Sequence, residues 1–421
     1  MLDIKFIREH KEIVEAGAKK KRMDFDVAKL IKVDDKRKEI LLSVEKKRTE
    51  QNEFSRQIAV CSNNDERIQL ISEMKILKEE LQKEEEDLKK VMKQWQVLML
   101  AVPNIPDISV PEGGSDADNV EVRVWGEKPS FSFQPKSHID LMTEKKMVDF
   151  ERGAKVAGFR GYYLKGDGAL LMFALWQYVT DFFMNRGGFT PIIAPSHLQR
   201  EAFLGTGYLP QGEEDLYKTQ DDTYFSGTAE VPVMAYYSDQ TLEVSEFPIK
   251  LFAFSPCFRR EAGSHGKDTK GLMRVHEFYK FEQVVLCEAS HETSVALHEE
   301  ITAHAEALMQ SLSIPYHVVA NCGGDLGLGQ VKKYDIEAWV PSENNYRETH
   351  SASYFHDFQT RRLNIRYKDS SGKLRFAHSL NSTALALPRV LIQLVENNQQ
   401  ADGSITVPEP LRKYLGGRSQ L

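Results

Sequence analysis

Cysteine is scarce in this sequence, and its spacing fits neither a metal site nor a disulfide framework. The chain of 421 residues holds Cys61, Cys257, Cys287 and Cys322, with no CxxC pair and no histidine at ligand spacing. These spacings argue against a structural zinc site and against a small disulfide-stapled fold. Unpaired cysteines are typical of a reducing compartment, so we expect a cytoplasmic protein.

Long apolar runs are also absent. No run approaches the roughly 20 residues that a membrane helix needs, and the N-terminal stretch MLDIKFIREHKEIVEAG begins with charges. We therefore predict no contact with a membrane. The glycine-rich turn at 323–329 lacks both the GxGxxG spacing before a helix and a Walker-type Gly-Lys-Ser/Thr end, which excludes the common nucleotide loops.

An excess of positive charge is missing as well. The formal net charge is −7, so any contact with a nucleic acid must come from local basic patches rather than from the whole surface. The length suits one large α/β or α+β domain with an appendage, or two to three ordinary domains.

The stretch 253–283 carries the side chains on which a function can be built. Runs 251–258 and 272–283 hold aromatic and β-branched residues around the polar, glycine-bearing segment 262–271, which predicts a β-hairpin with a long tip. Residues two apart share a strand face, so we expect one face to present Arg259, Glu261, Arg274, Phe278, Lys280 and Glu282.

The chemistry of this face suits a nucleoside triphosphate. Guanidinium groups match phosphate oxygens, carboxylates accept an ammonium or a metal ion, and a phenyl ring stacks on a base. A solvated sheet face has the same alternation of charges, so the hairpin alone leaves both interpretations open.

The first hundred residues predict a projecting helical arm. After a short helical region at 1–26, apolar residues recur at three-four spacing from 27 to 100, interrupted by the turn composition of 61–65. Two helices of 30 to 35 residues at about 1.5 Å per residue give an antiparallel hairpin roughly 50 Å long. Its basic runs 36–38, 46–48 and 89–90 suit a phosphate backbone, but the acidic run 84–87 offsets them, and a spacer or oligomerisation element is the alternative.

A Pro-, Gly- and Asp-rich linker at 102–119 separates this arm from a globular remainder. We expect helices at 142–157, 168–186 and 290–312, with Pro191 at the start or edge of a strand. Three further features stand out: the Arg-carboxylate run FRRE at 258–261, RETHS at 347–351, and an arginine that opens a helix in ALPRVLIQL at 386–394.

Together these stretches resemble bacterial-type seryl-tRNA synthetases, a family of class II aminoacyl-tRNA synthetases, along nearly the whole chain. The matching segments are VPNIPDISVPEG, NVEVRVWGE, GYYLKGDGAL, GGFTP of motif 1, the triplet Thr228-Ala229-Glu230, FRREAG to FEQ of motif 2, RETHS, and SLNSTALALPR of motif 3. Two departures are Ala384, Ala386 and Pro388 where motif 3 usually has glycines, and Arg260 where a small polar residue is common.

The resemblance implies an α+β fold with a mostly antiparallel catalytic sheet flanked by helices and an N-terminal antiparallel two-helix coiled-coil arm. The implied domains are a tRNA-binding domain at 1–101, the linker at 102–119 and the catalytic domain at 120–421. The implied reaction is ATP-dependent activation of L-serine and its transfer to serine tRNA, and to selenocysteine tRNA where present. The implied partners include a second copy of the chain and Mg²⁺.

The resemblance also assigns the site. ATP would be bound by Arg259, Arg260, Glu261, Arg274, Val275, Phe278, Glu348, Thr349, His350, Ser351 and Arg389, with Arg259, Glu261 and Arg389 as the catalytic set. Serine would be bound by Thr228, Ala229, Glu230, Arg259, Glu282, Asn381 and Thr383. Glu348 and Ser351 would hold Mg²⁺. The tip at 267–271 would contact the acceptor end of tRNA, and the arm would contact its long variable arm.

Two other functions share parts of this pattern. One is a paralogue that makes seryl-adenylate for a carrier protein, which would commonly lack the arm. The other is a non-catalytic coiled-coil interaction protein, which would require the loss of a motif residue. The arm and the residues Arg259, Glu261, Glu282, Glu348 and Arg389 are all present.

Overall fold

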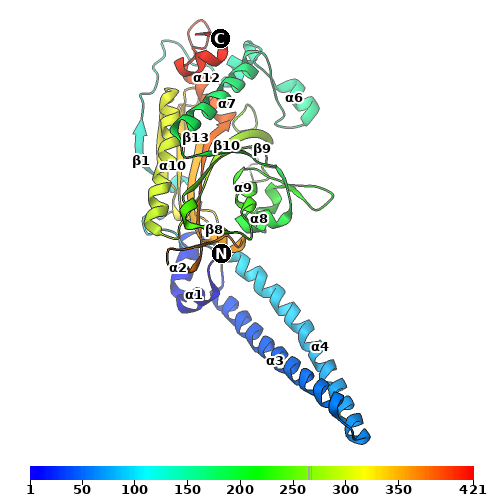
Figure 1. Ribbon diagram of the computed structural model, residues 1–421. Coiled ribbons are helices and arrows are strands. Elements are labelled where there is room, and N and C mark those ends of the chain that lie inside the picture. Colours follow the sequence, from blue (N-terminus) through cyan, green and yellow to red (C-terminus); the bar gives the residue numbers. More distant parts are fainter. Residues whose placement is uncertain (264–265, 267) are drawn as a thin grey trace. The chain divides into compact units, whose positions relative to one another are not determined.

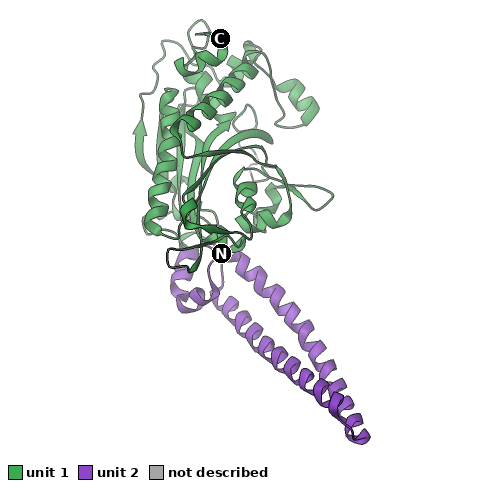
Figure 2. Ribbon diagram, viewed as in Figure 1, with its two compact units in different colours: residues 1, 20–22, 104–421 green, residues 2–19, 23–103 purple. Residues whose placement is uncertain are grey.

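The computed structural model describes residues 1–263, 266 and 268–421. Lys267, the first residue of the expected tRNA-contacting tip, lies outside the described residues. The chain forms two compact units, one of residues 1, 20–22 and 104–421 and one of residues 2–19 and 23–103 (Figure 2). None of the described helices is long and apolar enough to span a membrane.

The smaller unit is built on the predicted helical hairpin. Helices α1 (Ile4–Glu9) and α2 (Lys11–Lys20) precede α3 (Val27–Val60) and α4 (Asn64–Ala101), which pack on each other in antiparallel fashion. Asp26 caps α3 by accepting from Lys29 N at 2.8 Å, and Asn63 caps α4 by accepting from Asp65 N at 3.0 Å. The last residues of the predicted turn at 61–65 therefore belong to the first turn of α4, which Asn63 caps.

A buried carboxylate lies near the start of α3. Asp34 is 0% exposed and pairs with Arg8 Nη1 at 3.0 Å, Arg37 Nη2 at 2.8 Å and Lys38 Nζ at 3.2 Å. Burial works to raise the pKa of Asp34, but its hydrogen bonds with Arg37 and Lys38 outweigh burial and leave the pKa lowered. Asp34 thus joins α1 to the start of the hairpin through charge.

Two basic residues of α3, Lys47 and Arg48, form ion pairs with glutamates of α4. Lys47 Nζ lies 2.6 Å from Glu80 Oε2, and Arg48 Nη2 lies 2.7 Å from Glu85 Oε1. Lys90 pairs with Asp87 on its own helix at 3.0 Å. These pairs leave fewer cations available to a phosphate backbone than the sequence runs suggest.

The larger unit is organised by an eight-stranded sheet. The strand order is β1 (Val120–Trp125), β11 (Tyr316–Ala320), β12 (Lys332–Val340), β13 (Asn345–His356), β16 (His378–Leu387), β10 (Glu277–Cys287), β9 (Ile249–Phe258) and β4 (Thr190–Ile193). All neighbours pair antiparallel except β4, which runs parallel to β9 at the edge. Pro191 therefore lies in an edge strand, as predicted, where its missing N–H costs no ladder bond.

Helices cover the sheet and complete the α+β class (Figure 1). α10 (His291–Ser311) packs on β16 and β13, and α12 (Arg389–Asn397) packs on β12 and β16. The remaining helices are α5 (His138–Glu144), α6 (Phe150–Ala157), α7 (Asp167–Arg186), α8 (Arg200–Thr206), α9 (Glu230–Tyr236), α11 (Phe358–Arg362) and α13 (Glu409–Arg412). The main core joins α7, α10 and α12 to the central strands.

Three small sheets complete this unit. They are formed by β2 (Val148–Asp149) with β3 (Tyr163–Leu164), by β5 (His197–Leu198), β7 (Tyr224–Phe225) and β6 (Tyr217–Lys218), and by β15 (Leu374–Phe376), β14 (Arg366–Lys368) and β8 (Thr241–Glu243). They lie in the segments between the strands of the main sheet.

The single helix predicted at 142–157 is wrong. The structure has α5 and α6 with β2 between them, because Lys146 adopts φ 58° and Asp149 caps the new helix by accepting from Arg152 N at 2.9 Å. The predictions at 168–186 and 290–312 are confirmed by α7 and α10.

The return strand of the central hairpin begins later than predicted. β10 starts at Glu277 rather than Leu272, and β9 ends at Phe258, so Arg259, Glu261 and Arg274 lie in the connecting loop. Glu261 has φ 55°, and the loop closes where Arg259 N donates to His276 O at 3.0 Å. The shared strand face predicted for Arg259 and Glu261 is therefore wrong.

The expected linker is tied to the larger unit. Asn104 is buried and its Nδ2 donates to Gly329 O at 3.0 Å and Phe355 O at 2.8 Å. Lys21, which also belongs to this unit, donates from Nζ to Gly327 O, Leu328 O and Gln330 O at 3.0, 2.9 and 2.6 Å. The glycine-rich turn thus uses its carbonyls to hold a buried ammonium.

Candidate active site

A pocket lies over the central strands and over residues 259–261 and 272–275 of the connecting loop. Its lining includes ten residues that the sequence assigned to ATP or serine: Arg259, Glu261, Arg274, Val275, Phe278, Glu348, Thr349, Ser351, Thr383 and Arg389. They come from segments up to 130 positions apart, counted from Arg259 to Arg389, and β10, β13 and β16 bring them together because these strands are neighbours in the sheet.

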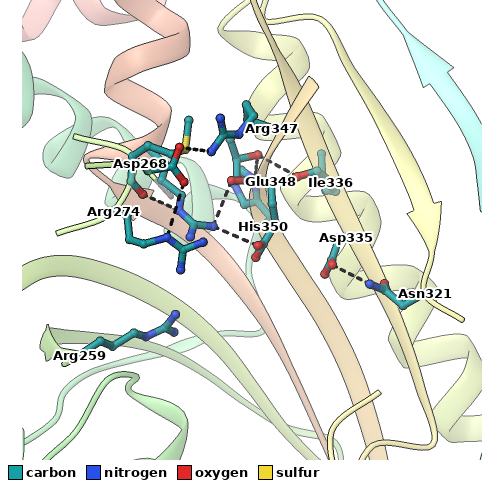
Figure 3. Close-up of polar contacts among 12 residues, drawn as sticks. Arg259, Asp268, Arg274, Asn321, Asp335, Ile336, Arg347, Glu348 and His350 are labelled. Carbon is teal, nitrogen blue, oxygen red and sulfur yellow. Dashed lines mark hydrogen bonds and ion pairs between the residues drawn. The ribbon is translucent and has the colours of Figure 1, made fainter. Parts of the chain in front are cut away.

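Arg259 is seated against the backbone of Gly227. Its Nε and Nη2 donate to Gly227 O at 3.4 and 3.3 Å, and its Cζ lies 5.4 Å from the ring centre of Phe278. A Cβ on Gly227 would meet Arg259 Cγ at 3.0 Å, so an alanine there would require the Arg259 side chain to shift by a few tenths of an ångström. The guanidinium is thereby aimed at a fixed place in the pocket, and Figure 3 shows it apart from the other charged groups.

Glu261 and Arg274 form an ion pair across the loop. Arg274 Nη1 lies 2.6 Å from Glu261 Oε2, and its Nε lies 3.5 Å from Asp268 Oδ2. Asp268 is in turn held by Arg347 Nη2 at 2.6 Å (Figure 3). This chain of alternating charges ties the two sides of the loop to β13.

Arg389 and Glu348 meet at the opposite side of the pocket. Arg389 opens α12, and its Nη1 lies 3.1 Å from Glu348 O and 3.2 Å from Glu348 Oε2, while its Nε donates to Met273 O at 3.3 Å. The Glu348 side chain is 46% exposed. Desolvation by the surrounding protein works to raise its pKa, but the charges of Arg389, Lys333 and Arg259 outweigh it and lower the pKa.

A β-bulge orients the segment after Glu348. Ile336 pairs with His350 and Glu337 pairs with Glu348, so Thr349 is the extra residue on β13. Its hydroxyl donates to Ile336 O at 3.1 Å and also lies 2.8 Å from His350 Nδ1. The bulge restores Ser351 to the pocket side, whereas His350 is buried and does not line the pocket.

Burial also shifts the pKa values of two groups next to this segment. Burial lowers the pKa of His350 to about 4, which keeps the ring neutral. Asp335, directly opposite Ser351 on neighbouring strand β12, accepts from Asn321 Nδ2 at 2.7 Å, and burial raises its pKa to about 6. A buried carboxylate therefore stands beside Ser351 on the neighbouring strand.

The triplet Thr228-Ala229-Glu230 stands at the start of α9. Glu230 is 5% exposed, and it accepts from Tyr208 OH at 2.9 Å on one oxygen and from Gln359 Nε2 at 2.6 Å on the other. Burial, helped by the nearby charge of Glu282, raises the pKa of Glu230 to about 7. Its charge therefore changes within the neutral pH range.

Lys280 connects this triplet to the pocket. Its Nζ donates to Thr228 Oγ1 at 2.9 Å and forms an ion pair with Glu282 Oε2. Thr383 lies directly opposite Glu282 on the neighbouring strand. Lys280 and Thr383 line the pocket, whereas Thr228, Ala229, Glu230, Glu282 and Asn381 lie outside its lining.

Arg260 lies away from the other assigned residues. Its backbone N donates to Asp215 O at 2.9 Å, and the exposed side chain lines a separate hollow beside Phe159 and His276. Nothing in the structure explains a role for Arg260 in holding ATP.

The oxygen donors at the pocket fit Mg²⁺ only as a partly protein-bound ion. Among the described residues, no cluster of three or more His, Cys, Asp or Glu side chains is arranged to hold a metal. Glu348 and Ser351 supply two oxygens beside an open pocket, and Mg²⁺ commonly binds through one or two carboxylates together with phosphates and water. The residues therefore fit an ion that arrives with its phosphates.

Sequence reasoning missed the groups that support the assigned residues. Lys280 stood in the predicted alternation without a role. Tyr208 and Gln359, which hold Glu230, lie 22 residues before it and 129 residues after it, and no local pattern links them. Asp268 and Arg347 were missed for the same reason.

Both units resemble known proteins. Residues 1–106 match the model of the seryl-tRNA synthetase N-terminal domain, and residues 215–398 match that of the tRNA synthetase class II core domain (G, H, P, S and T). The chain is 45% identical to the serine–tRNA ligase of Deinococcus radiodurans over 100% of this chain and 99% of that protein. It is 42% identical to that of Clostridium tetani over 99% of each.

A solved structure agrees with these sequences. The crystal structure of seryl-tRNA synthetase from Pyrococcus horikoshii complexed with ATP superposes with a TM-score of 0.89 at 36% identity, covering 100% of this chain and 99% of that one.

Proposed function

The chain belongs to the seryl-tRNA synthetases, and from that premise we propose that it is a serine–tRNA ligase that makes seryl-adenylate from L-serine and ATP and transfers the serine to tRNA. The observation that carries the proposal is the meeting of Arg259, Arg389 and Glu348 in one pocket of a chain that is similar to its relatives from end to end. Cytoplasmic location, as for the synthetases of the translation machinery, is part of the proposal.

We assign the nucleotide end of the pocket to ATP. Arg259 takes the α-phosphate, Phe278 stacks on the adenine, and Glu261 with the backbone of Val275 meets the edge of the base. Arg389 takes the γ-phosphate, at the start of a helix whose N-terminal dipole favours negative charge. The Glu261–Arg274 and Arg389–Glu348 pairs satisfy these side chains when no phosphate is present.

Mg²⁺, when it arrives with ATP, adds positive charge at the phosphate oxygens, and Glu348 and Ser351 are the residues that would hold it. Asp335 lies opposite Ser351 on the neighbouring strand. The half-exposed carboxylate of Glu348 supports this assignment because it already faces the pocket.

Catalysis then consists of positioning and charge stabilisation. A carboxylate oxygen of serine attacks the α-phosphorus, the bond to the bridging oxygen breaks, and pyrophosphate leaves. Arg259 lies where negative charge accumulates during this step. In the second step a hydroxyl of the terminal adenosine attacks the serine carbonyl, loses its proton, and AMP leaves. No covalent bond to the enzyme is required in either step.

Serine itself is assigned to the end of the pocket near Lys280. Glu230, Glu282 and Thr228 surround the ammonium, and Thr383 and Asn381 lie near the hydroxyl. A site that hydrogen-bonds the substrate hydroxyl leaves buried polar groups unpaired when alanine binds, and such sites reject the analogue by about 10⁴-fold.

The smaller unit is assigned to tRNA. We propose that the arm contacts the long variable arm of serine tRNA, that 1–101, 102–119 and 120–421 act as tRNA-binding domain, linker and catalytic domain, and that the loop before Gly271 meets the acceptor end. We also propose a homodimer, which the exposed apolar side chains of Leu170 and Phe173 on α7 and of Ile193 on edge strand β4, 47%, 52% and 82% exposed, support.

The test measures ATP–pyrophosphate exchange and tRNA charging separately. We expect exchange with serine but not with alanine, abolished in Arg259→Ala. Excision of residues 44–84, closed by a short turn, should keep exchange and lose charging, and it spares Lys21 and Asn104, which pack in the larger unit. Exchange that persists in Arg259→Ala refutes the proposed role of Arg259.

The two alternatives give different results in the same assays. A carrier-protein paralogue would show exchange without tRNA charging even with the arm intact. A non-catalytic interaction protein would show neither activity. The match of the chain to both synthetase domains favours neither alternative.

A further inference from the structure

We propose that Lys280 is the positioning residue of the serine site, where its buried ammonium fixes Thr228 and Glu282 relative to each other and balances the carboxylates that receive the substrate ammonium. The proposal rests on the proposed function. It assigns a role to Lys280, which is not among the residues proposed to bind ATP or serine. It follows from the contacts, the burial and the charges around the Nζ atom.

The contacts of Lys280 join two segments that carry serine-binding groups. Its Nζ reaches Thr228, which precedes α9, and Glu282, which lies two residues along on β10. The side chain of Thr228 also donates to Glu282 Oε2 at 3.4 Å. One ammonium thus closes a triangle of polar groups between a strand and the start of a helix.

Burial makes these contacts strong and their loss costly. Lys280 is 7% exposed, Thr228 2% and Glu282 2%. A charge in such surroundings needs a partner, and removing one member of a buried pair leaves the other uncompensated. Lys280 and Thr228 therefore restrict the torsions of Glu282.

The triangle leaves defined bonding capacity for a ligand. Among the described residues, Glu282 Oε1 has no hydrogen-bond donor, whereas Oε2 has both Lys280 and Thr228. Two of the three Nζ–H groups of Lys280 point to these partners. Glu282 is thus held with one oxygen engaged and the other open, which is the arrangement that orients a substrate ammonium.

Lys280 has a second effect, which is on the pKa of the nearby Glu230 carboxyl. The groups that act on Glu230 through hydrogen bonds or charge include Tyr208, Gln359, Glu282 and Lys280. Glu282 raises the pKa of Glu230 and Lys280 lowers it. Without Lys280, two neighbouring carboxylates would compete for protons, and one counter-ion for the substrate ammonium would be lost.

A purely structural ion pair is the competing explanation, and the kinetics separate the two. The variants are Lys280→Met, which removes charge and donors, and Lys280→Gln, which keeps a donor without the charge. Lys250→Met is the matched control, because Lys250 is an ion-paired lysine on neighbouring strand β9 whose Nζ lies 2.5 Å from Glu300 Oε1, away from the pocket.

The assay is serine-dependent ATP–pyrophosphate exchange between pH 5.5 and 9. We expect Lys280→Met to raise KM for serine about 10- to 100-fold, the loss that accompanies a broken charged hydrogen bond, with KM for ATP changed less than about 3-fold. The acid limb of kcat/KM for serine should move to higher pH. Lys280→Gln should recover part of the KM and show the same shift of the limb.

Equal increases of both KM values, or an acid limb that does not move, overturn the proposal. If Lys280→Met does not fold, Lys280→Gln carries the test through the pH profile alone. Lys250→Met should change thermal stability without changing KM for serine. Failure of the wild-type protein to exchange with serine refutes the proposed function, whereas normal exchange in both Lys280 variants refutes only the role of Lys280.

Discussion

Replacing Glu230 by glutamine should make the protein more stable at neutral pH and less active. Both carboxylate oxygens of Glu230 are hydrogen-bonded, to Tyr208 and Gln359, in a site that is 5% exposed. Burial raises its pKa from 4.5 to about 7, so ionisation is opposed in the folded state. The amide has the shape of the protonated acid but never ionises.

The size and sign of the effect follow from linkage. A carboxyl whose pKa is raised on folding contributes stability that is complete below its unfolded pKa and is lost as the pH rises through the folded value. A shift from 4.5 to about 7 corresponds to about 3 kcal/mol at 1.36 kcal/mol per pH unit. The stability of Glu230→Gln relative to wild type should therefore rise by about 3 kcal/mol between pH 4.5 and pH 8.

Urea unfolding of both proteins at pH 5, 6, 7 and 8 measures this difference. Glu201→Gln, which replaces an exposed glutamate on α8, is measured beside it as the control for the loss of a carboxylate. Glu230→Gln should also raise KM for serine, because the substrate ammonium loses a counter-ion, while KM for ATP stays unchanged. A stability difference that stays constant from pH 5 to pH 8 would show that Glu230 does not titrate in this range.

Two further substitutions test the seat of Arg259 and the start of the arm. Gly227→Ala should lower kcat/KM for ATP about 10- to 100-fold, because the new Cβ displaces the guanidinium by a fraction of an ångström, whereas Gly263→Ala, whose Cβ meets nothing within 4 Å, should not. Equal activity of the two variants would show that the close contact between Gly227 and Arg259 does not position the guanidinium. Asp34→Asn should destabilise the smaller unit by about 2 kcal/mol in thermal unfolding followed by circular dichroism. Asp35→Asn, which removes a 56% exposed carboxylate paired with Arg8, should cost less than about 0.5 kcal/mol, and a larger loss there would place the important charge at Asp35 instead.

The sequence predicts the structure most accurately where the signal lies in residues that are close together in the chain. The arm helices end at Val60 and Ala101, close to the limits read from the apolar spacing, because a helical seam is set by residues three and four apart. The break at β2 had a local signal too: Asp149 stands immediately before Phe150 as a helix cap. That signal was missed because apolar spacing continued across it.

The loop before β10 was misread because its burial is tertiary. Leu272, Met273 and Val275 resemble a strand in composition, but they are buried by packing and not by a ladder. Leu272 N donates to His138 Nε2 at 3.2 Å, a partner 134 residues earlier in the chain. No pattern within the hairpin contains that information.

The same limit applies to the candidate site. Residues that touch substrate in the proposal stand in recognisable runs, such as RETHS, whereas the groups that hold them do not. Gln359 reaches Glu230 from α11 and is itself held by the Ser379 hydroxyl at 2.7 Å from its Oε1. Such support is visible only when β16 and α11 are placed beside α9.

The hairpin arm also has a consequence for synthesis on the ribosome. α3 and α4 are joined through residues 61–63, so their contacts are close in sequence, whereas the sheet pairs Val120 with Ala320 across 200 positions. Contacts close in sequence form faster than distant ones. At about 5–20 residues per second of translation, the arm is complete and foldable ten seconds or more before β16 is made. The α3–α4 hairpin can therefore fold on the nascent chain while the long strands of the sheet still lack the strands with which they pair.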